Sequence, residues 1–279
     1  MDAIAARSVD LDQPHPPARL AARAFKAMLL RDLTVLRKNP GEFLARTIVQ
    51  PLLLVFVLGY VQPKIGLGPA SGAAAAQLAT ALVAGMLAIV TLFQGIQGIA
   101  IPLVREFGFT REIEDRVLSP LPVSLVALEK VTAGALQGLL AALVVFPIAV
   151  FIPAASPHLH INWPVLLTLA PLAALACSSL GLAFGTSFDP RYVMALFAVF
   201  LTPLMFLGCT LYSWSSLASI RWIQILSLAN PLTYVSEGFR AAVTTSDHLS
   251  LLVIYPVLVG FTALLLSIGL RNFRRRVIA

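Results

Sequence analysis

Long stretches without a charged residue dominate this sequence and limit the folds open to it. The longest, residues 131–188, contains no Asp, Glu, Lys or Arg. A helix needs about 20 mostly apolar residues to cross the hydrocarbon core of a membrane. With 58% hydrophobic and only 12% charged residues, the chain also has too little polar surface to cover a water-soluble globule. The sequence therefore predicts an all-α, polytopic membrane protein.

The limits of the spans follow from the positions of charges and prolines. A polar turn with several prolines, residues 153–164, divides the longest charge-free run into two crossings. The six predicted transmembrane helices cover about residues 45–62, 78–102, 126–152, 164–187, 191–212 and 249–270.

Basic residues are distributed unevenly between the segments that connect these spans. Of the 20 Lys and Arg residues, all but Lys64, Arg221 and Arg240 fall on one side of the predicted topology. By the positive-inside rule, the basic side faces the cytoplasm. This places both termini in the cytoplasm.

The ends of the chain are polar or basic. The polar composition of residues 1–17 predicts a disordered tail rather than a secretory signal. The arginines of residues 271–279 predict a basic cytoplasmic tail. Residues 18–38 carry apolar side chains at helical spacing with basic residues between them. This pattern predicts an amphipathic interfacial helix along the inner leaflet, with its apolar side in lipid. A solvated basic helix is the alternative.

The cytoplasmic segment 105–121 differs from its basic neighbours because it has mixed charge. Four acidic residues and three arginines precede Pro120 and Pro122. The positive-inside rule alone does not require four acidic residues in this segment. The mixed charge therefore favours a docking element for a partner protein. A solvated turn is the alternative.

The segment between spans five and six, residues 213–240, is more apolar than an external loop should be. Asn230 and Pro231 interrupt it. We expect two short helices that dip into the outer leaflet and return. Glu237 and Arg240 lie one helical turn apart and are predicted to pair at the level of the headgroups. A surface helix without a role in gating is the alternative.

Several kinds of chemistry are absent from the sequence. The basic residues lie in separate blocks, which argues against nucleic-acid binding, and no phosphate-binding loop, metal-ligand spacing or mid-span carboxylate occurs. Energy for transport must then come from elsewhere, or the pathway is passive. In the second span, Thr91, Gln94 and Gln97 recur every three residues. They could line a translocation path or bond to a neighbouring helix, which is the more common use of such residues.

Two motifs resemble those of a known family. Residues 105–122 read REFGFTREIEDRVLSPLP, and residues 230–240 read NPLTYVSEGFR. With a basic helix that ends in Asn39-Pro40, they resemble the membrane subunits of type-2 ATP-binding-cassette exporters, similar to the daunorubicin-resistance and nodulation-factor export permeases. The resemblance covers nearly the whole chain from about residue 18. It implies a single transmembrane domain, residues 18–270, in a bacterial cytoplasmic (inner) membrane.

The resemblance also implies partners and roles for individual residues. The chain would pair with a second membrane subunit, identical or related, and with two ATP-binding subunits that bind ATP and Mg²⁺. It would bind no cofactor itself and would not be an enzyme. The coupling contacts to the ATPase would be Glu106, Arg111, Glu112 and Arg116, and the residues near the exit would be Asn230, Pro231, Glu237 and Arg240. The family motif often reads G-T-x-E where this chain has residues 108–112, GFTRE.

The uncharged spans favour a hydrophobic drug or a lipid-like molecule as the exported substrate. Export of a lipid-linked glycan or polysaccharide is the nearest alternative, and a row of exposed aromatic rings along a wide inner groove would favour it. A more distant alternative is an ATP-independent carrier or a membrane anchor for a partner protein.

Overall fold

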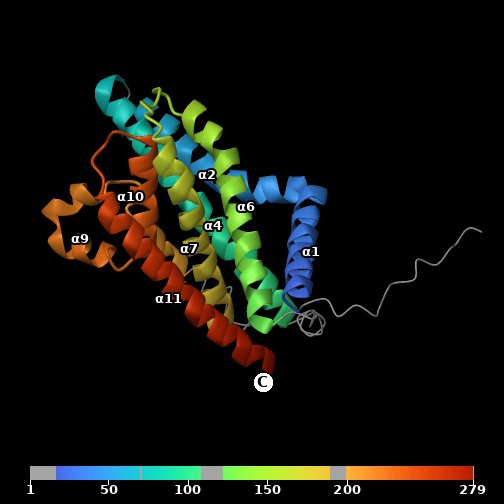
Figure 1. Ribbon diagram of the computed structural model, residues 1–279. Helices are drawn as coiled ribbons and strands as arrows, with labels where there is room; N and C mark the ends of the chain where they lie inside the picture. The colour runs from blue at the N-terminus through green and yellow to red at the C-terminus, as the bar shows by residue number, and fades with distance from the viewer. Residues whose placement is uncertain (1–16, 70, 108–121, 189–198, 279) are drawn as a thin grey trace, which may run out of the picture.

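Helix α4 lies at the centre of a helical bundle. The computed structural model describes residues 17–69, 71–107, 122–188 and 199–278, and every regular element in these ranges is helical (Figure 1). Helices α2, α6, α7 and α10 pack around α4, and α11 packs on the outside of α7. Their bounds are α2 Pro40–Phe56, α4 Gly72–Arg105, α6 Val123–Phe151, α7 Trp163–Ser187, α10 Pro231–Val243 and α11 Leu251–Ile278.

Five helices in the described part of the chain are long and apolar enough to cross a membrane. They are Phe43–Lys64, Gly72–Arg105, Val123–Phe151, Trp163–Ser187 and Leu251–Val277. The first of them continues α2 through a π-helical turn, Val57–Val61, and the short helix α3, Gln62–Lys64. An all-helical, polytopic fold is therefore confirmed.

The predicted fifth span, residues 191–212, begins outside the described residues. Residues 199–206 are helical. A total of six crossings, and the orientation derived from the charges, stay predictions.

Burial differs sharply between the central and the outer helices. In the most apolar 18-residue stretch of each helix, 78% of α4 is buried inside the protein, but only 11% of α11. Helix α11 presents large apolar side chains outward, among them Leu252, Val259 and Leu264. An outward apolar face on a helix of this length is suited to lipid, so α4 forms the protein core and α11 its lipid-facing wall.

Small residues allow α4 and α7 to approach closely. A Cβ atom added at Gly181 would lie 2.5 Å from the carbonyl oxygen of Gly95 and 2.9 Å from the Cα of Ile96, and one at Gly185 would lie 3.0 Å from the Cα of Ala100. The pair Gly181 and Gly185 thus provides the smooth face that brings two backbones together in a membrane helix pair.

Two helix ends differ from those predicted. Helix α4 begins at Gly72 rather than at residue 78, because residues 73–76 are alanines, the strongest helix formers. Helix α11 continues to Ile278 through most of the predicted basic tail. Basic side chains near a helix C-terminus interact favourably with its dipole, which is consistent with this extension.

The amphipathic helix α1 (Pro17–Lys38) packs in part against the bundle rather than only against lipid. Ala24, Phe25 and Met28 contact a cluster of buried residues at the base of α4 and α6. Leu20 and Leu30 remain exposed, at 39% and 51%. In Figure 1, α1 stands beside α6. The helix therefore has one apolar face for the protein and a second for the surrounding lipid.

The close contact between α4 and α7 predicts the effect of one added methyl group. We expect Gly181→Ala to destabilise the chain by about 1–3 kcal/mol, because backbone atoms of α4 would have to move. Gly260→Ala is the matched control, since nothing lies within 4 Å of a Cβ at this position on α11. Thermal unfolding in detergent can be followed with a thiol-reactive dye. Cys177 and Cys209 are buried, so the dye reacts with them only when unfolding exposes them. Equal melting temperatures for the two variants would contradict the described packing.

Candidate functional site

The segment between predicted spans five and six folds into three short helices, where two were expected, and the chain turns at Asn230-Pro231. These are a 3₁₀ helix η3 (Trp214–Ser219), α9 (Arg221–Ser227) and α10. The Asn230 side chain accepts a hydrogen bond from the Leu232 N–H at 2.9 Å, and Pro231 occupies the first helical position. An asparagine cap followed by proline is a favourable helix start, since the N–H that proline lacks has no partner inside a helix. This pair of residues therefore fixes where α10 begins.

Side chains in or just before α10 bond to the backbone carbonyl oxygens of residues 204–212. Their spacing of three or four residues places them on one face of the helix. The last carbonyls of a helix have no partner within it, and without water an unpaired carbonyl costs several kcal/mol. These side chains thus hold the end of the helix at residues 199–206 and the turns that follow it. The donors and acceptors are Asn230 to Leu204 (2.7 Å), Thr233 to Leu207 (3.2 Å), Ser236 to Gly208 (2.6 Å), and Arg240 to Cys209 (3.3 Å) and Tyr212 (3.2 Å).

Glu237 and Arg240 form an ion pair inside the protein. They are 0% and 1% exposed, and the Arg240 guanidinium donates directly to the carboxylate. The same carboxylate accepts hydrogen bonds from the backbone N–H of Trp214 and of Leu249, each at 2.9 Å. The pair therefore connects the start of η3 and the residues before α11 to α10. It is enclosed by protein, whereas the sequence analysis placed it at the headgroups.

A second buried ion pair lies at the opposite end of α4. Lys130 of α6 donates to the carboxylate of Glu106, just after α4, at 2.7 Å, and both residues are almost fully buried. From the sequence, Glu106 was predicted to contact the ATPase. Here Glu106 joins α4 to α6. The other predicted contacts, Arg111, Glu112 and Arg116, lie outside the described residues.

The C-terminal turns of α11 hold the ends of α4 and α7. Arg276 donates a hydrogen bond to the carbonyl oxygen of Phe188, and its guanidinium lies 5.6 Å from the centre of the Phe107 ring. Phe273 meets the Phe107 ring edge-on at 5.7 Å between centroids, and Asn272 donates to the Ser187 hydroxyl at 3.0 Å. Phe107 is the last described residue before segment 108–121. We call this group of contacts the basal clamp; the sequence analysis missed it.

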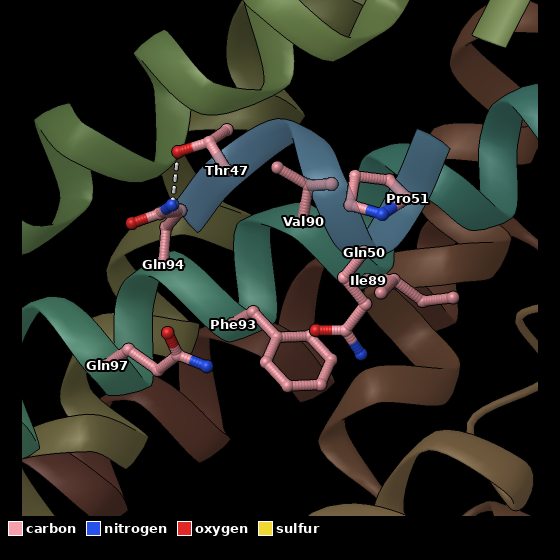
Figure 2. Close-up of a pocket in the computed structure, with 8 residues that line it drawn as sticks. All are labelled: Thr47, Gln50, Pro51, Ile89, Val90, Phe93, Gln94 and Gln97. Carbon is pink, nitrogen blue, oxygen red and sulfur yellow. Dashed lines mark hydrogen bonds between the residues drawn. The ribbon is translucent and has the colours of Figure 1, made fainter. Parts of the chain in front are cut away.

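The polar residues of the second span divide between two roles. Thr91 donates to the Leu87 carbonyl of its own helix at 2.7 Å. Gln94 donates to the Thr47 hydroxyl of α2, which joins the two helices. Gln94 and Gln97 also line a small hollow between α2 and α4, with free space of about 10 Å³, enough for about one water (Figure 2). The predicted bond to a neighbouring helix therefore occurs at Gln94, Thr91 is not part of the wall, and a translocation path along these residues stays a prediction.

The α2 side of this hollow was also missed. Thr47 and Gln50 line it, and their spacing of three residues within an apolar span is the signal that could have identified them. Among the described residues, no group of three His, Cys, Asp or Glu could hold a metal ion. The hollow contains only uncharged polar and apolar groups.

Comparison with known proteins identifies a family to which the sequence is similar. Residues 23–244 match the family model described as ABC-2 type transporter. The inner membrane transport permease YadH of Escherichia coli strain K12 is 31% identical to the chain over 156 residues, and the protein of the same name from Shigella flexneri matches equally. The match covers 55% of this chain and 58% of each relative. The chain thus spans less than two thirds of the length of these curated relatives.

The buried pair in α10 predicts a stability effect that depends on orientation. We expect Arg240→Met to cost about 3–5 kcal/mol, because it leaves a buried carboxylate without its cation. Exchanging the two residues, Glu237→Arg with Arg240→Glu, should not restore stability. Trp214 and Leu249 would then present N–H groups to a guanidinium instead of to an acceptor.

Arg31→Met is the control for that experiment. The Arg31 side chain is 54% exposed where it pairs with Asp32, and exposed pairs contribute about 1 kcal/mol or less. Unfolding in detergent measures all the variants. An exchanged pair as stable as the unmodified chain would show that the backbone contacts of Glu237 and Arg240 are unimportant.

Proposed function

The chain belongs to the ABC-2 type transporter family, and we propose that it is the membrane subunit of an ATP-driven exporter for a hydrophobic drug or lipid-like molecule. The family match over residues 23–244 carries this proposal. A membrane permease of this family is a transport component and not an enzyme, as the sequence analysis predicted. The predicted inner-membrane location is also confirmed, since the relatives are inner membrane permeases and the chain has multiple candidate spans.

In this proposal, ATP and Mg²⁺ bind to partner subunits and not to this chain. Permeases of the family pair with ATP-binding subunits, and the sequence itself has no phosphate-binding loop. We infer two ATP-binding subunits and a second membrane subunit, identical or related. The likeness to the daunorubicin-resistance and nodulation-factor permeases supports the outward direction of transport.

The two contacts at the base of the bundle support a role for segment 105–121 in coupling. Glu106 is paired with Lys130, and Phe107 is held by Phe273 and Arg276 of the basal clamp. A displacement of this segment by an ATPase would therefore move α4, α6 and α11 rather than bend a free loop. This is the physical requirement for transmitting ATP-driven closure into the membrane.

Helix α4 extends from this coupling end past the hollow to the external segment. Its outer half contacts the turn that α10 caps, since a Cβ at Gly85 would collide with the carbonyl oxygen of Thr210. Movement of α4 would thus alter the hollow and the external helices together. We assign the wall of the translocation path to the α2 and α4 face that carries Gln94 and Gln97.

The alternatives from the sequence analysis receive less support. The described hollow holds one aromatic ring, Phe93, and not the row of rings along a wide groove that would favour a polysaccharide. An ATP-independent carrier or a simple anchor does not fit a match to a transporter family over most of the chain.

Co-purification with an ATP-binding subunit tests the proposed function. When the chain is produced with the ATPase encoded beside its gene, we expect a stable complex and ATP-dependent transport in vesicles. Arg111→Glu combined with Glu112→Arg should weaken the complex by about tenfold or more, because reversed charges face like charges across the interface. Gly260→Ala, on the lipid-facing helix, is the control and should retain both properties. Failure to bind any ATP-binding subunit, or full transport by the charge-reversed variant, would refute the proposal.

A further inference from the structure

The outward side of helix α11 forms a continuous stripe. Its residues recur every three or four positions, which is the spacing of one helix face, and all of them are exposed. They are Val253, Pro256, Gly260, Leu264, Ile268, Arg271 and Arg275. The stripe is apolar as far as Ile268 and cationic from Arg271. Three residues of an α-helix rise by about 4.5 Å, so the surface changes from apolar to charged within one turn.

Three arginines occupy the cationic end of this stripe. Arg271 precedes Arg274 and Arg275 by three and four residues, so the three side chains share one side of the helix. All three are exposed, and none forms an ion pair with an acidic residue in the part of the chain that the structure describes. Like charges at this spacing destabilise a helix. An anionic partner would therefore stabilise the last turns of α11.

The inward side of the same turns belongs to the basal clamp. Arg276 donates to the Phe188 carbonyl oxygen and lies against the Phe107 ring, which also meets Phe273. Asn272 donates to a hydroxyl of α7. The outer guanidinium groups take no part in these contacts. Each of them is a planar fork of N–H donors that matches the oxygens of a phosphate.

The position of the outer arginines favours a lipid phosphate over a soluble partner. A soluble protein would approach the end of the bundle, but these arginines continue the face on which Leu264 and Ile268 are 54% and 37% exposed. A phospholipid has the same order of groups, with acyl chains beside the apolar residues and a phosphate at their edge. Basic clusters at the cytoplasmic side of membrane helices attract anionic lipids, and this end of α11 is the predicted cytoplasmic end.

We propose that Arg271, Arg274 and Arg275 bind the head group of an anionic phospholipid, and that cardiolipin, which carries two phosphates, binds best. Two phosphates neutralise three guanidinium groups more fully than the single phosphate of phosphatidylglycerol. The lipid is a bound regulator and not the transported substrate, because it lies on the outer wall of the bundle. By stabilising the last turns of α11, it also stabilises the basal clamp that holds Phe107.

Lipid binding to the purified full-length chain tests the inference without ATP or a partner. Native mass spectrometry from detergent micelles counts the lipids that stay bound at increasing concentrations of cardiolipin, phosphatidylglycerol or phosphatidylethanolamine. We expect one cardiolipin per chain, with an apparent affinity at least tenfold higher than that of the zwitterionic phosphatidylethanolamine, and an intermediate affinity for phosphatidylglycerol. This comparison uses the unmodified chain, so it does not depend on how any variant folds.

Charge removal on α11 locates the binding site. The combined variant Arg271→Gln, Arg274→Gln and Arg275→Gln should weaken cardiolipin binding tenfold or more. The corresponding three lysine substitutions should retain most of the affinity, because lysine also binds phosphate, as a point charge. A loss of binding that lysine restores is a property of the charges and not of helix folding.

Three exposed cations of α1 provide the matched control. Arg23→Gln, Arg37→Gln and Lys38→Gln together remove the same charge from another surface, and cardiolipin affinity should stay within about twofold. The inference is overturned if the unmodified chain binds all three lipids equally, if this control loses as much affinity as the α11 variant, or if the α11 variant keeps its affinity. Should the α11 variant keep cardiolipin but lose an ATP-binding subunit, the arginines belong to a protein contact. The proposed function fails separately, through the absence of an ATP-binding partner.

Discussion

Backbone carbonyl groups between residues 204 and 212 constrain the segment that leads to α10. Residues 199–206 are helical but residues 207–212 form turns, so most of these carbonyls lie outside a regular helix and need other donors. Helix α10 supplies donors for them from Asn230, Thr233, Ser236 and Arg240. Because Arg240 would otherwise be a buried cation, Glu237 must lie beside it, and the carboxylate in turn organises the neighbouring turns. The need to bond these carbonyl groups thus accounts for these five polar residues in and just before α10.

Helix α4 relates the polar sites to one another. Its C-terminal end leads to Glu106, its C-terminal half carries Gln94 and Gln97, and its N-terminal half contacts the turn at Thr210 through Gly85. Glycine contacts with α7 leave little room between these two backbones. A densely packed helix of this kind shifts as a unit rather than deforming locally. The arrangement is suited to a transporter in which nucleotide binding and substrate release occur at opposite ends.

The sequence predicted best those features that depend on local composition. Five spans could be located because apolar length is a property of each segment alone, and the spacing of Glu237 and Arg240 predicted their pairing. The predicted span 126–152 already contained Lys130, but its pairing was not predicted, because its partner Glu106 lies 24 residues away, just after another helix. The basal clamp and the α2 wall of the hollow depend on contacts between distant segments, which no local pattern specifies.

Helix α11 is connected to the rest of the protein at both of its ends. The Leu249 N–H just before it bonds to Glu237, while Asn272 and Arg276 near its other end bond to residues 187–188. Its 28 residues span about 40 Å. Membrane helices commonly adjust to bilayer thickness by tilting, and a helix held at two points has less freedom to do so. The surrounding lipid must then adapt its own thickness to the protein, which makes acyl chain length a variable that acts on this transporter through its outermost helix.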